Sequence, residues 1–245
     1  MESNKKISII IAAGGSAERF GQRNLISKQF LLLKNKPLLL YSLEKFLSLK
    51  NVVEIVIVTN NVNSTSKLLE EASYPDNVKI KVVEGGKLRQ DSVYNGFCNL
   101  DTSSNLVVIH DVARPLFEPE DLKKCIDTAF TSGAAVLAVP VIDTIKCAKS
   151  DKDRLIVKST LDRSELFLIQ TPQIFRYDLL SMAYEKFRAK SLIPLITDEA
   201  NMIEVIGESV NLVLGDRKNI KITYPEDLEI ANSFLKKVTI SSGAF

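Results

Sequence analysis

The chain has 245 residues, of which 45% are hydrophobic, and this suits one large α/β domain with a sizeable core. Its 32 lysines and arginines face 30 acidic residues, so the net charge is only +2. This balance excludes the strong basic excess of a nucleic-acid-binding protein, and any phosphate recognition has to be local.

The cysteines and the first residues indicate a cellular compartment. Cys98, Cys125 and Cys147 are odd in number, widely spaced and lack a C-x-x-C pair, which argues against a disulfide framework and a zinc site. The start, MESNKKISII, passes at once into a short strand, which predicts neither a signal peptide nor a transit segment. No apolar run is long enough to span a bilayer. We therefore expect a cytoplasmic protein with no membrane or nucleic-acid partner.

Short apolar runs alternate with amphipathic stretches along the chain. This alternation is typical of a doubly wound α/β fold with a parallel sheet, in which ligands bind beyond the carboxyl ends of the strands. Helices are predicted at Lys36 to Leu49, with Pro37 in the first turn, and at Pro119 to Ser132, ending at Gly133. The predicted strands are Ile7 to Ala12, Val53 to Thr59, Lys79 to Val83, Leu106 to His110 and Ala134 to Val139.

Two later segments depart from this alternation. Ile145 to Ser164 is polar and carries a turn signal at Ser150 to Asp153, which predicts a projecting hairpin. A two-stranded ribbon is marginal alone in water, so we expect it to pack on the same arm of a second subunit, with a surface excursion as the alternative. Thr223 and Glu226 form a predicted capping box, with Pro225 in the first turn of a last helix to about Lys237.

The loop that follows the first strand reads AAGGSAERFG, from Ala12 to Gly21, and is followed by Lys28-Gln29-Phe30. Small residues let main-chain amides approach phosphate oxygens, and Arg19 and Lys28 supply positive charge. The spacing matches neither the P-loop nor the dinucleotide fingerprint. A nucleoside triphosphate is the ligand that this pattern favours, and an ordinary tight turn is the alternative.

A second glycine turn, Gly85 to Val93, follows the strand that ends at Val83 and begins a helix. Backbone amides and the Ser92 hydroxyl can hold a base or a ribose there. The alternative is an ordinary first helical turn, in which Lys87 and Arg89 are solvated charges.

A carboxylate emerges beside an arginine at the next strand end, His110 to Pro115. Asp111 is placed to bind a divalent ion that bridges phosphate oxygens, and Arg114 to grip a phosphate with its planar fork. The alternative is a local ion pair. His110 is the only histidine, so it makes neither a zinc site nor a Ser-His-Asp triad, and it is interpreted as structural.

Further hydroxyls and cations lie in predicted loops, each with an ordinary alternative role. Thr197 is a natural N-cap of a helix through Ile206, and Thr171 before Pro172 can shape a turn. Lys221 lies just ahead of the last helix, aimed at a phosphate or at solvent. The segments are Asp143-Thr144, Arg163, Gln170-Thr171-Pro172-Gln173, Thr197-Asp198-Glu199 and Asn219 to Thr223.

Nine segments in order resemble the 2-C-methyl-D-erythritol 4-phosphate cytidylyltransferase family: AGGSAERFG, KQF, GGKLRQDSV, HDVARP, DTIK, LDRS, QTPQIF, TDEA and NIKIT, from Ala13 to Thr223. The resemblance implies a Rossmann-like, doubly wound, mostly parallel sheet in a single nucleotidyltransferase domain of residues 1–245, with a dimerisation β-arm at about residues 143–165. It implies that CTP and 2-C-methyl-D-erythritol 4-phosphate react to 4-diphosphocytidyl-2-C-methyl-D-erythritol and pyrophosphate, in the non-mevalonate route to isoprenoids. A magnesium ion and a homodimer are part of the same expectation.

The resemblance also assigns residues to roles. Gly86 and Ser92 would contact cytosine and ribose with Val112 near the ribose, and Asp111 would hold the magnesium ion. Arg19, Lys28 and Lys221 would stabilise charge on the α-phosphate. The phosphate loop falls on Ala13, Gly14, Gly15 and Arg19. Around the sugar phosphate would lie Arg114, Thr144, Arg163, Thr171, Thr197 and Lys221, with Thr144 and Arg163 coming from the neighbouring subunit's arm.

Three positions depart from the family pattern. Ala17 stands where a second glycine is usual, which leaves one backbone approach to the triphosphate less open. Ser27 replaces a proline before Lys28, in a loop that is longer than usual, so we expect that loop to be looser. Val112 replaces an alanine.

Three other functions are alternatives for this sequence. A ribitol 5-phosphate cytidylyltransferase shares the fold, but the TDEA segment and the DTIK and LDRS segments favour the methylerythritol substrate. A non-catalytic nucleotide-binding protein has less need of Arg19, Lys28, Asp111 and Lys221 around one phosphate. A glycosyltransferase is disfavoured because no Asp-x-Asp pair stands at a predicted strand end.

Overall fold

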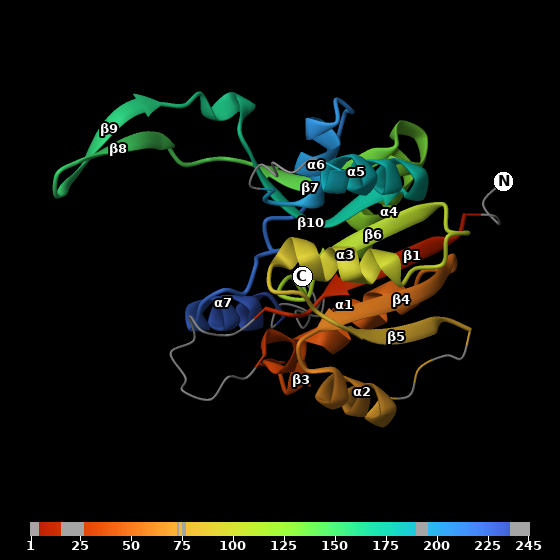
Figure 1. The fold of residues 1–245 in the computed structure, drawn as a ribbon. Coiled ribbons are helices and arrows are strands. Elements are labelled where there is room, and N and C mark those ends of the chain that lie inside the picture. The colour runs from red at the N-terminus through yellow and green to blue at the C-terminus, as the bar shows by residue number, and fades with distance from the viewer. Residues whose placement is uncertain (1–4, 16–26, 73, 75–76, 190–195, 236–245) are drawn as a thin grey trace, which may run out of the picture.

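The computed structural model describes residues 5–15, 27–72, 74, 77–189 and 196–235. Within these residues, the centre is a seven-stranded sheet in the order β11-β7-β10-β6-β1-β4-β5 (Figure 1). Its strands are β1 (Ile7–Ala12), β4 (Val52–Thr59), β5 (Lys79–Glu84), β6 (Leu106–Asp111), β7 (Ala134–Pro140), β10 (Phe167–Arg176) and β11 (Asn211–Leu214).

The sheet is mostly parallel, which confirms the predicted fold class. β1 pairs in parallel with β4 and β6, β4 with β5, and β7 with β11. The five strands predicted from the apolar runs agree with β1, β4, β5, β6 and β7 to within one residue at each end. The carboxyl ends of β1, β4 and β6 therefore meet at one edge, as expected of a doubly wound sheet.

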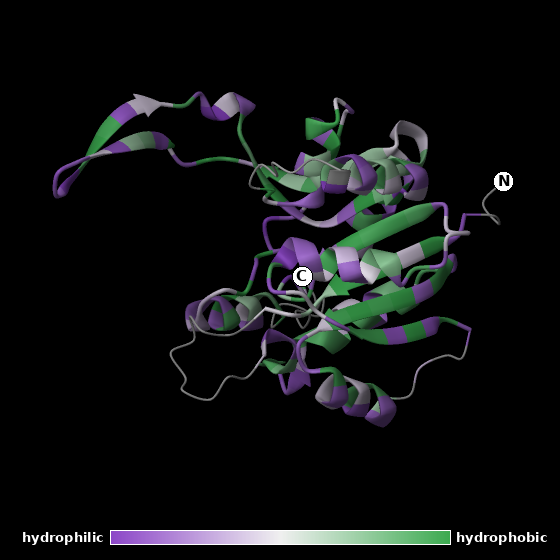
Figure 2. Cartoon of the chain, in the orientation of Figure 1, coloured by the Kyte–Doolittle hydropathy of each residue, from purple (hydrophilic) through white to green (hydrophobic). Residues whose placement is uncertain are grey.

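Helices cover both faces of the sheet, because successive side chains of a buried strand point to opposite sides. Ile9 and Ile11 of β1 join the core beneath α1 (Leu38–Leu47), α2 (Val62–Glu71) and α4 (Pro119–Ser132). Ile10 joins the core beneath α3 (Arg89–Cys98), α5 (Tyr177–Ala189) and α6 (Glu199–Val205). The central strands are accordingly hydrophobic along their length (Figure 2). A third cluster packs α7 (Pro225–Leu235) against Leu33 and Leu38.

The strand β10 corrects one prediction. It is antiparallel to both β6 and β7, and the segment Gln170 to Gln173, predicted as a loop, lies inside it. Its polar residues suggested a turn, but Gln170, Thr171 and Gln173 are buried and hydrogen-bonded. The pairing with β7 shifts between Ile169 and Gln173, an irregularity that accommodates a proline within a sheet.

The helix predicted from Lys36 begins at Leu38 instead, with Pro37 as its N-cap. Lys36–Pro37 forms the short strand β3, which pairs antiparallel with β2 (Leu32–Leu33). Lys34 and Asn35 both have positive φ, at 46° and 62°, and this is the backbone of a two-residue hairpin turn.

Two predicted N-caps are displaced by one residue. The helix expected from Thr197 begins at Glu199, and the side chain of Asp198 caps it by accepting from the Asn201 amide at 2.9 Å. The predicted capping box of Thr223 and Glu226 is wrong. Asp227 accepts from the Thr223 and Tyr224 amides, at 2.7 and 2.8 Å. Helix α7 is described to Leu235, so the predicted end near Lys237 lies outside the described residues.

The predicted hairpin projects away from the sheet (Figure 1). β8 (Lys146–Asp151) pairs antiparallel with β9 (Arg154–Thr160) around a turn at Lys152 and Asp153. Every residue of β9 is exposed, including Leu155 at 82%.

In the described part of the chain, no helix is long and apolar enough to cross a bilayer.

The single histidine joins three elements in the core, as its structural interpretation predicts. His110 is fully buried on β6. Its ring nitrogens are 3.1 Å from the Ser42 hydroxyl of α1 and 3.1 Å from the Thr171 hydroxyl of β10. Its ring packs edge-on against Phe46 and Phe117. Burial lowers the pKa of His110 to about 3, so the imidazole is neutral at physiological pH.

We predict that the imidazole of His110 does not titrate in the folded protein between about pH 8 and about pH 5. The unfolded chain binds this proton near its ordinary pKa of 6.5, and the folded chain only near 3. This group therefore lowers the free energy of unfolding as the pH falls from 6.5 towards 3, by about 1.4 kcal/mol per pH unit. Proton NMR of the one histidine ring tests this, and a ring that titrates near its ordinary pKa while the protein stays folded would contradict it.

Candidate active site

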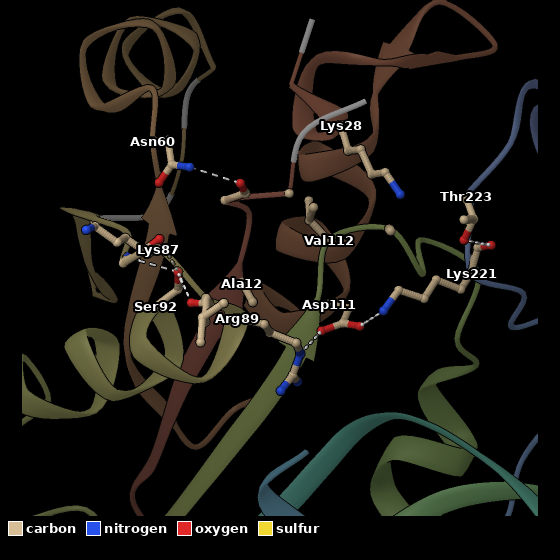
Figure 3. A pocket seen from close by; sticks show the side chains of 15 residues that line it. Ala12, Lys28, Asn60, Lys87, Arg89, Ser92, Asp111, Val112, Lys221 and Thr223 are labelled. Carbon is tan, nitrogen blue, oxygen red and sulfur yellow. Dashed lines mark hydrogen bonds and ion pairs between the residues drawn. The ribbon is translucent and has the colours of Figure 1, made fainter. Parts of the chain in front are cut away.

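A cleft of about 540 Å³ opens at the carboxyl ends of β1, β4 and β6 (Figure 3). It brings together the two glycine turns, the strand end at Asp111 and the segment before α7. The described residues that line it are Ala12, Gly14, Gly15, Lys28, Asn60, Gly86, Lys87, Leu88, Arg89, Ser92, Asp111, Val112, Ala113, Lys221 and Thr223. Eight of the predicted site residues are among them: Gly14, Gly15, Lys28, Gly86, Ser92, Asp111, Val112 and Lys221.

The first glycine turn is held in place at both of its described ends. The Ala13 amide donates to the Val58 carbonyl at 2.7 Å, and Ala13 itself is buried, so it shapes the turn without lining the cleft. Asn60, at the end of β4, donates to the Gly14 carbonyl at 3.2 Å. Arg19 and Ala17 lie outside the described residues.

Lys28 begins a short 3-10 helix, Lys28–Phe30, and its side chain enters the cleft (Figure 3). Its ammonium donates to the Ile222 carbonyl at 3.1 Å. The Ile222 amide in turn donates to the Ala113 carbonyl at 2.8 Å. These contacts join the first turn, the strand end of β6 and the segment that carries Lys221, which are far apart in sequence.

The second turn requires its glycines. A Cβ at Gly86 would lie 2.3 Å from the Asp91 Cβ, and one at Gly85 would lie 2.5 Å from the Asn60 Oδ1. The Gly86 amide donates to the Ser92 hydroxyl at 3.0 Å, and that hydroxyl lies 3.1 Å from the Leu88 carbonyl. Ser92 therefore holds the turn in shape, whether or not its hydroxyl also contacts a ligand.

Asp111 lies between two cations. Its Oδ1 accepts from Arg89 Nε at 3.0 Å, and its Oδ2 accepts from Lys221 Nζ at 2.6 Å. Burial acts to raise the pKa of Asp111, but Arg89 and Lys221 outweigh it and hold that pKa well below its usual range. The carboxylate is therefore ionised at neutral pH. Its partners are not the neighbouring Arg114 of the predicted local ion pair but two cations that are distant in sequence.

Arg89 is not the solvated charge that the sequence suggested. Its Nη1 donates to both carboxylate oxygens of Glu199, at 3.2 and 2.8 Å, while its Nε is bonded to Asp111. Burial acts to lower the pKa of Arg89, and the two carboxylates outweigh it and raise that pKa. For Glu199, burial raises the pKa and the Arg89 contact opposes that shift.

The other predicted residues do not line the cleft of a single chain. Arg114 donates to the carbonyls of Asn219 and Ile169, at 2.8 and 3.3 Å. Thr171 is buried on β10, and its hydroxyl accepts from the Asp111 amide at 3.0 Å, so it fixes the strand end beneath the site. Thr197 is exposed before α6. Thr144 is exposed at the base of the arm, and Arg163 donates to the Ile142 carbonyl there at 2.6 Å.

The sequence did not single out Asn60, Leu88 or Thr223 as site residues, and it left Lys87 and Arg89 as possible solvated charges. Asn60 directly follows β4, so the rule that ligands bind at strand ends pointed to it. The Glu199 contact that fixes Arg89 spans 110 residues, and no local pattern shows such a pair.

The residues that could hold a metal ion are few. Among the described residues there is no group of three or more His, Cys, Asp or Glu side chains that could do so. One ionised carboxylate in a cleft that is also lined by cations suits a hard cation such as Mg²⁺, which commonly takes one or two carboxylates together with phosphates and waters. Asp111 meets that requirement, since each carboxylate oxygen has a second acceptor site.

The fold and the cleft define a Rossmann-like nucleotidyltransferase. The family model described as 2-C-methyl-D-erythritol 4-phosphate cytidylyltransferase matches residues 7–237, and the chain belongs to that family.

Relatives and solved structures agree with this family. The chain is 40% identical over 236 residues to the Clostridium botulinum 2-C-methyl-D-erythritol 4-phosphate cytidylyltransferase, covering 96% of this chain and 99% of the relative. It is 39% identical to the chloroplastic enzyme of Oryza sativa, covering 95% and 75%. The crystal structure of 4-diphosphocytidyl-2C-methyl-D-erythritol synthase from Anaerococcus prevotii superposes with a TM-score of 0.80 at 31% identity, covering 96% of this chain and 97% of that one.

We predict that Gly86→Ala lowers the stability of the ligand-free protein by about 1–3 kcal/mol, because the new methyl group collides with Asp91. Gly15→Ala is the matched control, since a Cβ there meets Lys28 Cδ at an ordinary 3.9 Å. Urea unfolding of both variants measures the difference. Equal midpoints for the two variants would show that the second turn does not depend on glycine.

Proposed function

We propose that this chain transfers the cytidylyl group of CTP to 2-C-methyl-D-erythritol 4-phosphate, giving 4-diphosphocytidyl-2-C-methyl-D-erythritol and pyrophosphate in the non-mevalonate route to isoprenoids. The observation that carries the proposal is the meeting of Lys28, Lys221 and Asp111 between two glycine turns in one cleft. A cleft with several cations and one ionised carboxylate complements a triphosphate that carries a metal ion. Family membership supplies the identity of the two substrates.

The chemistry needs alignment more than proton transfer. A phosphate oxygen of the sugar phosphate attacks the α-phosphorus of CTP, and the bond from that phosphorus to the oxygen bridging to the β-phosphate breaks as pyrophosphate leaves. The attacking oxygen is already ionised at neutral pH, so no general base is required. Lys28, Lys221 and Arg19 stabilise the charge that develops on the α-phosphoryl oxygens.

The two turns divide the binding of CTP. Gly86, Ser92 and Val112 hold the cytosine and ribose, and Gly14 and Gly15 present backbone to the phosphates, while Ala13 shapes their turn from beneath. Asp111 would hold a magnesium ion, which when bound would supply positive charge against the phosphates. In this proposal Arg114 and Thr197 serve the sugar phosphate, while the buried Thr171 acts through the strand end that it fixes beneath the site.

The arm completes the site in a homodimer. Apolar side chains exposed on it, such as Leu155 and Val157, gain from burial against a second copy. Thr144 and Arg163, at the base of the arm, would then reach the sugar phosphate of the neighbouring subunit. The domain of residues 1–245 acts as one unit in this proposal. Its three free cysteines suit a reducing cytoplasm.

We predict that pyrophosphate is released when the protein is given CTP, magnesium and 2-C-methyl-D-erythritol 4-phosphate. The same assay with ribitol 5-phosphate is the comparison, and we expect turnover there to be negligible. Activity with ribitol 5-phosphate alone would replace the proposed substrate. If no pyrophosphate is released with either sugar phosphate, the protein is better explained as a nucleotide-binding protein without catalysis.

We predict that two inactive variants restore activity in a mixed dimer. Lys28→Ala lowers turnover by about 10²-fold or more, because a preorganised transition-state donor is lost. Arg163→Ala is also impaired, but its pocket regains an intact arm from a Lys28→Ala partner. Co-expressed one to one, the pair should recover about a quarter of wild-type activity, since half of the dimers are mixed and each has one complete site.

The control is Lys123→Ala, an exposed position on α4, co-expressed with Lys28→Ala. There the activity should equal the share of Lys123→Ala subunits in the mixture. If mixing Lys28→Ala with Arg163→Ala restores nothing beyond the two variants alone, the arm does not serve the neighbouring site.

A further inference from the structure

The mechanism above leaves a buried carboxylate beside the cleft without a role. The side chain of Glu199, the first residue of α6, is only 1% exposed, and both of its oxygens accept from Arg89. Burying a charge is costly unless it is paired. Replacing a buried ion pair with well-packed hydrophobic residues often leaves the protein equally stable or more stable. A buried carboxylate whose arginine partner lines a polar cleft therefore calls for an explanation beyond stability.

The backbone around Glu199 is held firmly. Asp198 accepts from the Gln173 side-chain amide at 2.8 Å, and the Ala200 amide donates to the Gln173 side-chain oxygen at 3.4 Å. Both neighbours of Glu199 are thus bonded to one residue of the central strand β10. The start of α6, and with it the Glu199 carboxylate, is therefore held against the central sheet.

Arg89 bridges Glu199 and Asp111, so the position of Glu199 restrains that of Asp111. Its Nη1 is occupied by Glu199 on the buried side, which leaves Nε directed at the Asp111 Oδ1 at 3.0 Å (Figure 3). A planar guanidinium can hold two carboxylates in a set relative orientation, whereas a lysine ammonium cannot. The arginine connects the start of α3, the end of β6 and the start of α6.

The two cations on Asp111 differ in how firmly they are held. The Lys221 side chain is 43% exposed, and that of Arg89 is 29% exposed with a buried partner. When a triphosphate enters, Lys221 can leave the Asp111 Oδ2 for a phosphate oxygen. Asp111 then keeps one bonded cation and its place in the cleft.

We propose that Glu199 is a positioning residue that acts through Arg89, so that Asp111 stays fixed while Lys221 moves to the phosphates. This role rests on the proposed function. It requires no direct contact of Glu199 with a substrate. Its negative charge also keeps Arg89 Nη1 on the buried side, so that Arg89 binds Asp111 through Nε alone and leaves Oδ2 to the metal ion once Lys221 has moved.

Removing the charge at Glu199 should release this restraint. In Glu199→Gln the shape is kept, but Arg89 loses its buried counter-charge and turns more fully to Asp111. Binding of the metal–nucleotide complex should weaken about 10–100-fold, the range found when a group that orients a metal ligand is lost. Arg89→Lys should give the same effect, because it keeps the charge and loses the fork.

The experiment compares wild type, Glu199→Gln and Arg89→Lys by two measurements. Isothermal titration with CTP, with and without magnesium, reports binding independently of turnover. The rate of pyrophosphate release at varied magnesium concentration gives the magnesium concentration at which activity is half-maximal. We expect both variants to need about 10-fold or more magnesium, and to bind CTP without magnesium within about twofold of wild type.

Glu54→Gln is the matched control. Glu54 is a buried carboxylate paired with a lysine, Lys81, at 3.1 Å, and it does not line the cleft. This variant should lose stability without any change in magnesium dependence. If it shifts the magnesium requirement as much as Glu199→Gln, the effect is general destabilisation and the positioning role is overturned.

The outcomes separate this inference from the proposed function. Unchanged magnesium dependence in a folded Glu199→Gln or Arg89→Lys overturns the inference even when the wild type is active. Weaker binding of magnesium–CTP by the variants supports the inference even when the wild type releases no pyrophosphate. The absence of pyrophosphate release by itself overturns only the proposed function. If Glu199→Gln does not fold, Arg89→Lys decides.

Discussion

The carboxylate of Asp111, held between Arg89 and Lys221, is the contact on which the rest of the site depends. It lies at the end of β6, and its two cations come from segments 22 and 110 residues away in sequence. Each cation is close enough to make ionisation of Asp111 favourable despite burial. The cleft is thus polarised before any ligand enters, with positive groups placed where phosphates would lie and a single negative group among them.

The sheet makes this arrangement possible because its parallel strands end at one edge. β1, β4 and β6 deliver a glycine turn, Asn60 and Asp111 to neighbouring places, and the core beneath them fixes their spacing. The antiparallel β10 adds support from below. Its Thr171 hydroxyl accepts from the Asp111 amide and contacts His110, so the strand end that carries the carboxylate is anchored to the core on both sides.

Local patterns were enough to predict the five apolar strands, the arm and most of the cleft. The glycine turns and Asp111 could be singled out because strand ends in a doubly wound sheet are where ligands bind. Lys28 and Lys221 were assigned to the site through the resemblance of their segments to the family. What failed were features that depend on partners distant in the chain. Gln170 to Gln173 looked like a loop because burial of polar residues is tolerated only with hydrogen-bond partners, which sequence does not show. Arg89 looked solvated for the same reason, since Glu199 lies 110 residues away.

The ligand-free ion pairs and the proposed chemistry are linked by preorganisation. Charged groups that already point into a cleft need little rearrangement when charge develops on a phosphate, and this is the main way a protein stabilises such a transition state. Unpaired, however, these cations would repel one another and cost folding free energy. Asp111 resolves the conflict, because it offsets the repulsion between Arg89 and Lys221 while the cleft is empty. Lys221, the more exposed of the two, can then exchange a carboxylate oxygen for a phosphate oxygen without leaving either charge unpaired.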